Sequence, residues 1–177
     1  MIRSCTERDL LDIYAVINDG AHAYRGVIPP EHWRDPYMPV EELRSEIAAG
    51  VRFWGYELSD RLIGVMGLQE VLDTALIRHA YVRTAYRNQG VGGQLLAELR
   101  AQTELRLLVG TWGAARWAIR FYEKHGFCLV GERTKNRLLR RYWSIGAPQI
   151  AASVVLAEPA ATRGKSSSGL RGGRSRT

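Results

Sequence analysis

The sequence predicts a single α/β domain of the mixed α+β type, with a mostly antiparallel sheet of six to seven strands flanked by about four helices. Three consecutive apolar runs are joined by short polar turns, a pattern typical of antiparallel hairpins. Farther along the chain, apolar stripes at helical spacing alternate with short apolar runs that suit buried strands. A chain of 177 residues has the size of one ordinary domain, which leaves little room for a second.

The first part of the chain is expected to form one strand and two helices. Residues 1–5 suit a short edge strand, and Thr6-Glu7-Arg8-Asp9 resembles a capping box that starts a helix. Apolar side chains then follow the helical period, at Leu10, Ile13, Tyr14 and Ile17. A loop rich in proline and aromatic residues separates this helix from a second one over 41–49, which Gly50 ends.

The remaining elements follow in an order that suits one mixed sheet. Three strands are predicted over 51–58, 62–71 and 74–82, with turns at Ser59-Asp60 and Leu72-Asp73. A helix then carries the stripe Val91, Leu95, Leu96 and Leu99, followed by a strand over 105–110 and a helix over 114–124. The last two strands are expected over 127–131 and 153–156. Between them lies a basic stretch that contains Arg133, Lys135, Arg137, Arg140 and Arg141.

The composition excludes several classes of protein. Apolar residues make up 46% and charged residues 24%, which argues against collagen-like, coiled-coil and wholly disordered chains. The longest run without charge, 142–157, is too short and too polar to span a membrane, and we see no signal peptide. The two distant cysteines, Cys5 and Cys128, suit free thiols in a reducing cytoplasm, where we expect the protein to be located.

Most of the net charge of +7 belongs to the C-terminal tail. Residues 159–177 contain five basic and no acidic residues, which leaves +2 for residues 1–158 (20 basic and 18 acidic side chains). The sequence therefore predicts a folded domain over 1–158 and a disordered basic tail, rich in Ser, Gly and Arg, over 159–177. The alternative for the tail is an electrostatic arm for RNA or another anionic surface. We expect the folded domain to bind neither nucleic acid nor membrane.

The segment over 80–97 is the most informative part of the chain, because a predicted strand ends there in a glycine-rich turn that opens a helix. Free N–H groups and the helix dipole favour an anion at such a helix start. Gly90, Gly92 and Gly93 lack side chains, so a phosphate can approach the backbone closely, and Arg87 adds positive charge. Neither the P-loop pattern nor the dinucleotide pattern GxGxxG is present.

Two motifs in this region resemble those of the GNAT superfamily of acyl-CoA-dependent N-acetyltransferases. Arg87-Asn88-Gln89-Gly90-Val91-Gly92 is similar to its R/Q-x-x-G-x-G/A motif, and AIRFYEKHGF over 118–127 is similar to its second signature. The order of predicted elements over 2–157 also matches. The resemblance implies acetyl-CoA as co-substrate, with its pyrophosphate on the turn and its pantetheine arm on the preceding strand. The implied cofactor-binding residues are Tyr81, Val82, Arg87, Asn88, Gln89, Gly90, Val91, Gly92 and Gly93.

The chemistry that the resemblance implies is transfer of an acetyl group to a primary amine of a small molecule, with an amino-acid-like acceptor as one option. A backbone N–H near Val82 is the implied donor to the developing oxyanion. Tyr122 stands at the position of the general acid, and its neutral phenol can protonate the leaving thiolate; the alternative is a packing aromatic. His79 is the candidate base because imidazole titrates near neutral pH. A structural histidine, with a water chain or a neutral amine in its place, is the alternative.

Two positions depart from the family pattern. Ala115 stands where an asparagine is frequent, and Leu76 stands where many members have a glutamate that acts as base. These departures support a second hypothesis, an acyl-CoA-binding module with little catalysis. Strand alternation further predicts that Arg78 and His79 lie on opposite faces of the sheet.

The acceptor end is less determined by the sequence. The resemblance suggests Tyr24, Arg25, Trp33 and Tyr37 as acceptor-lining residues, and the alternative is that the aromatics only cap the sheet. Arg25, Arg78 and the basic stretch could favour an acceptor with a carboxylate or phosphate, unless they are solvated surface. The histidines and cysteines show no metal-ligand spacing, so we expect no metal. The apolar strand over 154–156 could pair across a homodimer.

Overall fold

The computed structural model describes residues 1–159, so the predicted basic tail lies outside the described residues apart from Pro159. Seven strands form one sheet in the order β1-β2-β3-β4-β5-β7-β6, and β4 with β5 is its only parallel pair among these residues. The strands are β1 (Ile2–Ser4), β2 (Arg52–Leu58), β3 (Arg61–Val71), β4 (Thr74–Val82), β5 (Leu107–Trp112), β6 (Cys128–Leu129) and β7 (Ser153–Ala157). The helices are α1 (Leu10–Ala21), α2 (Val40–Ala48), α3 (Val91–Ala101), α4 (Arg116–Lys124), α5 (Glu132–Tyr142) and α6 (Ala147–Ala152).

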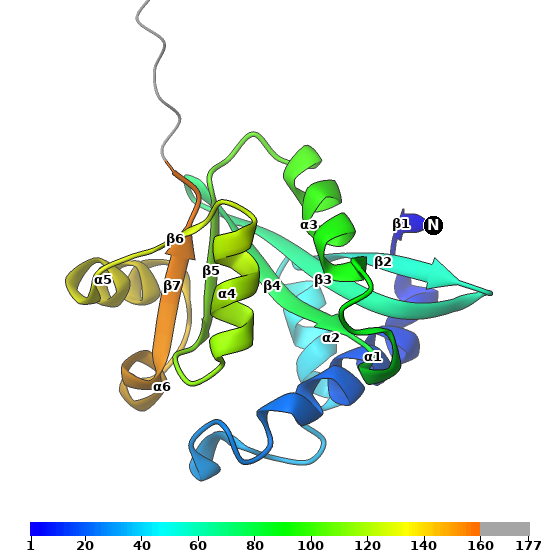
Figure 1. The fold of residues 1–177 in the computed structure, drawn as a ribbon, viewed down its shortest axis with the longest axis horizontal. Helices are drawn as coiled ribbons and strands as arrows, with labels where there is room; N and C mark the ends of the chain where they lie inside the picture. The colour runs from blue at the N-terminus through cyan, green and yellow to red at the C-terminus, as the bar shows by residue number, and fades with distance from the viewer. Residues whose placement is uncertain (160–177) are drawn as a thin grey trace, which may run out of the picture.

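Helices cover both faces of the sheet (Figure 1). The helices α3 and α4 lie on the near face, where Leu95 and Leu99 of α3 share a buried cluster with Ile77 of β4. The helices α1 and α2 lie behind, where Val16 and Leu43 pack with Val65 of β3. The predicted mixed, mostly antiparallel α/β architecture is therefore confirmed. Every helix within residues 1–159 falls short of the length and apolar character needed to cross a bilayer.

The three hairpin strands β2 to β4 match the prediction closely, because their turns are written in local sequence. Ser59 and Asp60 have φ values of 50° and 59°, as a two-residue turn between right-twisted strands requires. The strand β4 begins and ends at the predicted residues, whereas β5 is shifted by two residues from its predicted range and β6 is shortened to two residues.

The stretch between the last two strands was predicted without helices, and the structure corrects this. It forms α5 and α6, so that the described chain has six α-helices rather than about four. The apolar side of α5 is short and lies among arginines: Leu138, Leu139 and Tyr142 face the sheet, together with buried Lys135. The Lys135 ammonium donates to Ile150 O at 3.1 Å, which joins the two helices.

The proposed dimer edge is also corrected. The strand that contains residues 154–156 is β7, which pairs with β5 on one side and β6 on the other. From Val155 to Ala157 the backbone groups of β7 are therefore used on both sides within the sheet, and this part of the strand offers no free edge to a second copy.

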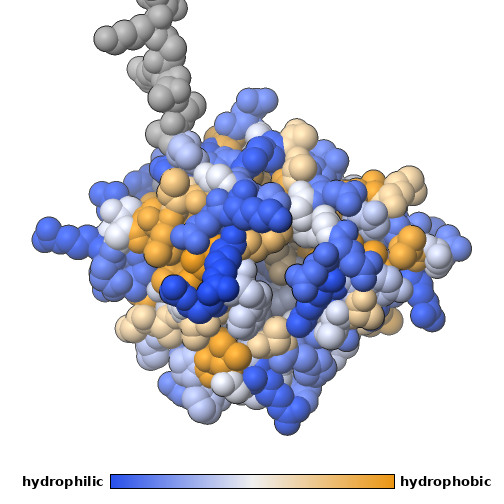
Figure 2. Space-filling model, in the orientation of Figure 1, coloured by the Kyte–Doolittle hydropathy of each residue, from blue (hydrophilic) through white to orange (hydrophobic). Residues whose placement is uncertain are grey.

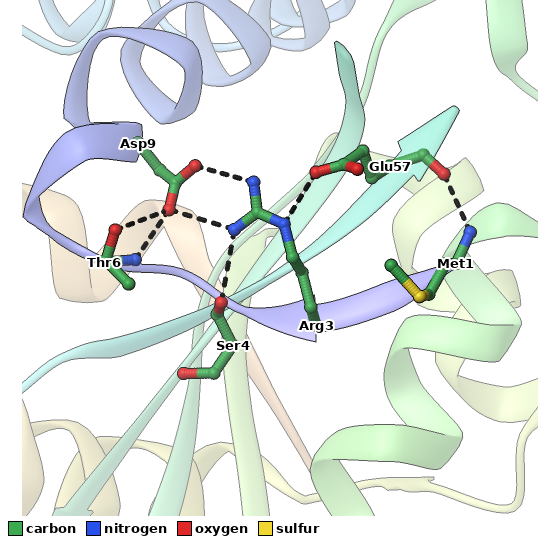
Figure 3. Close-up of polar contacts among 6 residues, drawn as sticks. All are labelled: Met1, Arg3, Ser4, Thr6, Asp9 and Glu57. Atoms are coloured by element: carbon green, nitrogen blue, oxygen red, sulfur yellow. Dashed lines mark hydrogen bonds and ion pairs between the residues drawn. The ribbon is translucent and has the colours of Figure 1, made fainter. Parts of the chain in front are cut away.

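The edge strand β1 is fixed to α1 and β2 by one guanidinium group (Figure 3). Arg3 donates from Nη1 and Nη2 to the two carboxylate oxygens of Asp9, at 3.0 and 2.8 Å, and from Nε to Glu57 at 2.6 Å. The Asp9 carboxylate also accepts from the backbone N–H of Thr6 at 2.7 Å, as predicted for the residue that closes a capping box. Hydrogen bonds from Arg3 lower the pKa of buried Asp9 to about 2.

Candidate active site

The site lies where the parallel strands β4 and β5 separate. They pair only from Ala75 to Ile77 of β4, after which a bulge interrupts the register between β3 and β4. Two residues of β4, His79 and Ala80, stand opposite one residue of β3, and His79 has a φ of 47°. The bulge bends β4 away from its parallel neighbour and leaves an opening in the middle of the sheet.

Two cavities, each of about 860 Å³, meet at this opening. We call one the α3–α4 cavity: it lies under the start of α3 and beside α4, and it is seen as a hollow with a hydrophilic rim on the face shown in Figure 2. The other, the α2–α5 cavity, lies between α2 and the end of α5. The two cavities share the lining residues Tyr24, Ile77, His79, Tyr81, Gly110 and Thr111.

The glycine-rich turn forms the end of the α3–α4 cavity. Asn88 and Gly90 have left-handed φ values of 60° and 81°, and Gly90 is the N-cap of α3. The N–H groups of Val91, Gly92 and Gly93 belong to the first helical turn and have no helical acceptor. All five residues line the cavity. The turn can therefore offer several converging N–H donors to an anion.

The structure gives Gly92 and Gly93 a second reason to be glycine, which sequence reasoning missed. A Cβ at Gly92 would lie 3.3 Å from the Phe121 ring, and one at Gly93 would lie 2.9 Å from His125 Nε2. Both residues therefore allow α3 to pack closely against α4. Close approach of a phosphate is not needed to explain these two glycines, whereas Gly90 is required by its left-handed backbone.

The two polar side chains of the motif behave differently. Arg87 lines the α3–α4 cavity and donates from Nη2 to Gly20 O at 2.6 Å, which fixes its guanidinium beside the end of α1. Gln89 does not line the cavity: its amide donates to Ala85 O at 3.2 Å and closes the turn on itself.

The N–H of Val82 points into the opening. The neighbouring N–H of Arg83 donates to Ile63 O of β3 at 2.8 Å. Successive N–H groups of a strand point to opposite sides, so that of Val82 is directed away from β3 and toward the separated β5. Tyr81 and Val82 both line the α3–α4 cavity, and their predicted contact with the cofactor stays a prediction.

Tyr122 on α4 lines the same cavity. Its side chain is 4% exposed and packs edge-to-face on Phe121 at 5.0 Å. Burial raises the pKa of its phenol, and the nearby Tyr24 raises it further, so the group is protonated at neutral pH. Its hydroxyl makes no hydrogen bond to the residues over 1–159.

The imidazole of His79 lines both cavities, and the predicted alternation with Arg78 is wrong. The bulge turns both side chains toward Glu46 on α2. Arg78 Nη2 donates to Glu46 Oε2 at 2.5 Å, and His79 Nε2 lies 3.4 Å from the same oxygen. Nε2 is buried and makes no hydrogen bond within the described chain. Contact with His79, and then with Arg78, lowers the pKa of Glu46.

Glu46 carried no signal in the sequence, because it appears as one of several acidic residues on an amphipathic helix. Its side chain is fixed through a short chain of hydrogen bonds that ends at Ala49, the C-cap of α2. Arg78 Nη1 donates to Gln69 Oε1 at 2.5 Å, and Gln69 Nε2 donates to Ala49 O at 3.0 Å. The carboxylate is therefore held in place on the wall of the α2–α5 cavity.

The two departures from the family pattern have structural explanations. Leu76 is fully buried and packs with Leu138 and Tyr142 of α5 and with Trp143 just after it, so a carboxylate at position 76 would be covered by α5. Ala115 is fully buried beside Trp112 and lines neither cavity.

Aromatic side chains gather in the α2–α5 cavity. Of the four suggested acceptor-lining residues, Tyr24 and Tyr37 line it, whereas Trp33 packs behind Tyr37 at 5.6 Å and Arg25 is exposed elsewhere. Burial raises the pKa of Tyr24 to about 12 and also raises that of Tyr37. Four further aromatic residues line this cavity and were not predicted to do so: Tyr81, Trp112, Tyr142 and Trp143.

Metal and thiol chemistry receive no support from the described side chains. Residues 1–159 contain no cluster of three His, Cys, Asp or Glu side chains that could hold a metal ion. Burial raises the pKa of the Cys5 thiol to about 12, and Cys128 is exposed on β6, away from both cavities.

An opening in a sheet that joins two cavities is a place where two ligands can meet. Residues 49–128 match the family model of the acetyltransferase (GNAT) domain. The chain thus contains a GNAT acetyltransferase domain, and the recognised motifs lie within it. No curated protein gives a sequence match.

Solved structures share the fold at low sequence identity. The PaiA N-acetyltransferase of Thermoplasma acidophilum, in complex with coenzyme A, is 20% identical, with a TM-score of 0.67 over 89% of this chain and 97% of that chain. A GNAT-family acetyltransferase of Staphylococcus aureus Mu50 is 16% identical, with the same TM-score and coverage. The ribosomal-protein-S18-alanine N-acetyltransferase of Escherichia coli is 19% identical, with a TM-score of 0.61 over 94% and 97% of the two chains.

Proposed function

We propose that this chain transfers the acetyl group of acetyl-CoA to a primary amine of a small molecule. The observation that carries the proposal is the meeting of the two cavities at the β4–β5 opening. Anion-binding N–H groups lie at the end of one cavity, and a carboxylate, an imidazole and aromatic rings line the other. Direct transfer requires the thioester carbon and the amine to meet at one point, and the opening is the place where they can do so.

The residues of the α3–α4 cavity fit coenzyme A as co-substrate. The free N–H groups of Val91, Gly92 and Gly93, with the guanidinium of Arg87, would hold the diphosphate. When bound, acetyl-CoA supplies an acyl group activated as a thioester. The inward N–H of Val82 would donate to the carbonyl oxygen as negative charge develops on it. The coenzyme A complex of the Thermoplasma acidophilum neighbour supports this assignment.

Tyr122 is the proposed general acid. Its phenol lines the α3–α4 cavity, is protonated at neutral pH and has no hydrogen-bond partner among residues 1–159 that would compete for its proton. It would donate that proton to the sulfur as the thiolate leaves, because a thiol is a better leaving group than its anion.

His79 is the proposed general base, and Glu46 is the proposed positioning residue behind it. Glu46 is a carboxylate at neutral pH, and a carboxylate beside Nε2 favours the tautomer that carries its proton there. Nδ1 then keeps the lone pair that can take the proton of the attacking amine. With Leu76 covered by α5, the base has to come from another residue. Of the shared lining residues, Tyr24 and Tyr81 are phenols whose pKa is raised by burial, which leaves the imidazole of His79 as the proton acceptor.

A paired measurement tests the proposal. We expect coenzyme A to raise the melting temperature of the protein, and acetyl-CoA with a panel of primary amines to release thiol at a rate that depends on the amine. His79→Gln should lower kcat without weakening coenzyme A binding. Unchanged melting with coenzyme A, at concentrations that saturate known acyl-CoA enzymes, would overturn the proposal.

The second candidate is an acyl-CoA-binding module with little catalysis, favoured by the apolar residues at positions 76 and 115. The same experiment separates the two. Stabilisation by coenzyme A without amine-dependent thiol release would select the binding module.

A further inference from the structure

The charges that line the α2–α5 cavity are unbalanced toward negative. Its carboxylates are Glu31, Glu42 and Glu46, and its guanidinium groups are Arg34 and Arg78. Arg34 forms an ion pair with Glu42, and Arg78 forms one with Glu46. Glu31 makes no ion pair with any side chain in the part of the chain that the structure describes. The cavity thus offers one free carboxylate, while both of its guanidinium groups are already neutralised.

Arg78 is the less available of the two guanidinium groups. Its side chain is 18% exposed, and its hydrogen bonds reach both Glu46 and Gln69. An acceptor carboxylate would have to displace Glu46, which would leave that carboxylate partly buried and unpaired beside a second negative charge. The contacts of the Arg78 side chain therefore argue against the expectation that it binds an anionic acceptor.

The basic stretch of α5 does not reverse this balance. Arg133, Arg137 and Arg140 are exposed and line neither cavity. Arg141 is exposed, lines neither cavity and lies 3.4 Å from Asp73, and Lys135 is buried against Ile150 O. These cations face solvent or the α5–α6 contact rather than an acceptor.

The rest of the cavity surface is suited to a cation or an apolar body. Six aromatic side chains line it, namely Tyr24, Tyr37, Tyr81, Trp112, Tyr142 and Trp143. The Trp112 indole donates to Tyr37 Oη at 2.9 Å, and Trp143 packs over the backbone of Gly110 at the opening, where a Cβ would lie 3.4 Å from its ring. Aromatic faces attract ammonium groups and stack on apolar groups.

We infer that the acceptor is an amine without a carboxylate, an arylalkylamine or an alkyl diamine rather than an amino acid. The inference rests on the proposed function for the identity of the site, and it narrows the acceptor that this site takes. The ammonium enters a cavity with one unpaired carboxylate and aromatic walls, whereas an α-carboxylate finds no free cation among the lining residues. An amine without a carboxylate therefore takes the place of the amino-acid-like acceptor that the sequence suggested.

Matched pairs of acceptors test the inference, because each pair differs only by the carboxylate. Phenethylamine is compared with phenylalanine, and putrescine with ornithine. Binding is measured by calorimetry on the full chain loaded with coenzyme A, so the result does not depend on turnover. In the pair whose amine binds more tightly, we expect the amine without the carboxylate to bind at least tenfold more tightly than the amino acid. Where acetylation occurs, that amine should also have the higher kcat/KM.

The contribution of Glu31 is tested with a matched substitution. Glu31→Gln should weaken binding of the preferred amine roughly three- to tenfold, since one charge at the cavity rim is lost. Glu104→Gln makes the same chemical change on the exposed turn before β5, outside both cavities, and should leave binding unchanged.

Two results would overturn the inference: equal or tighter binding of the amino acid in both pairs, or no binding of any of the four compounds. Its failure differs from failure of the proposed function. A bound amine without thiol release refutes acetyl transfer and keeps the amine class, whereas efficient acetylation of phenylalanine or ornithine keeps acetyl transfer and refutes the amine class.

Discussion

Substitution of Gly90 by alanine separates backbone strain from anion binding, because Gly126 provides a matched control. Both glycines have left-handed φ values, 81° and 87°, and an added Cβ would clash at neither: the nearest atom to that of Gly90 is Gln94 Nε2 at 3.8 Å, and none lies within 4 Å at Gly126. Each alanine therefore lowers the free energy of unfolding only through the strain of an L residue in the left-handed region. The net loss is about 1 kcal/mol, because alanine also reduces the entropy of the unfolded chain. For a domain of this size that lowers the melting temperature by about 2–4 °C.

The two variants should differ in coenzyme A binding. Relief of strain at Gly90 moves the N–H groups of Val91 and Gly92, which follow it directly, whereas Gly126 follows α4 and lines neither cavity. Loss of one charge-assisted hydrogen bond is worth about 1.5–3 kcal/mol, or roughly 10- to 100-fold in the dissociation constant. Calorimetric titration with coenzyme A should show this loss for Gly90→Ala and wild-type affinity for Gly126→Ala. Equal affinities in two variants of equal stability would refute the phosphate-binding role of the turn.

Three further predictions follow from the pKa shifts and contacts of single side chains. Tyr122→Phe should lower kcat about 100-fold. It should change the free energy of unfolding by less than about 0.5 kcal/mol, since the hydroxyl has no partner within residues 1–159. Tyr56→Phe on β2 is the control, and a kcat as high in Tyr122→Phe as in this control would show that Tyr122 only packs. Because the Asp9 pKa is lowered to about 2, its carboxylate stabilises the fold fully above its unfolded pKa of about 4 and loses this effect as pH falls through 2. Asp9→Asn should therefore cost about 2 kcal/mol at pH 7 and less than about 0.5 kcal/mol at pH 2. Acid-unfolding series of both proteins measure this, and a cost that stays constant down to pH 2 contradicts it. Because burial raises the pKa of Tyr24 to about 12 and that of Tyr81 well above its ordinary value, both stabilise the fold below pH 10 and lose this effect as pH rises toward 12. The phenolate absorbance of the protein at pH 11 should therefore rise when urea unfolds it. An absorbance that does not change would show that the pKa values of Tyr24 and Tyr81 are not raised.

Periodicity and turn residues were sufficient to predict most elements of the sheet and the helices around it. The sequence did not predict α5, because its few apolar side chains, such as Leu138 and Leu139, stand among five basic residues and give no clear helical period. Helices are recognised by their apolar side, and here that side is short and includes Lys135, which is buried only through its bond to Ile150 O of the next helix. Such a contact exists only in the folded chain.

The candidate site was predictable on its cofactor side and less so on its acceptor side. The turn and Tyr122 lie within local sequence motifs, so the spacing of residues within those motifs was enough to find them. The relation of His79 to Glu46 could not be found in this way, because strict alternation assumes an unbroken strand and the bulge at His79 removes it. Likewise, Gly92 and Gly93 were assigned to phosphate approach, although their Cβ positions face Phe121 and His125 of a helix that follows much later in the chain.

The two halves of the site have a common origin in the parallel pair β4 and β5. Parallel neighbours need a crossover connection, and α3 supplies it, so the helix must begin beyond the carboxyl end of β4. Its free N–H groups therefore lie over the point where β4 separates from β5. The bulge that ends the pairing also turns His79 and Arg78 toward Glu46, on the opposite side of the sheet from α3. One local irregularity thus accompanies the opening of the sheet and places His79 and Glu46 beside it, on the other side from the cavity that the start of α3 closes.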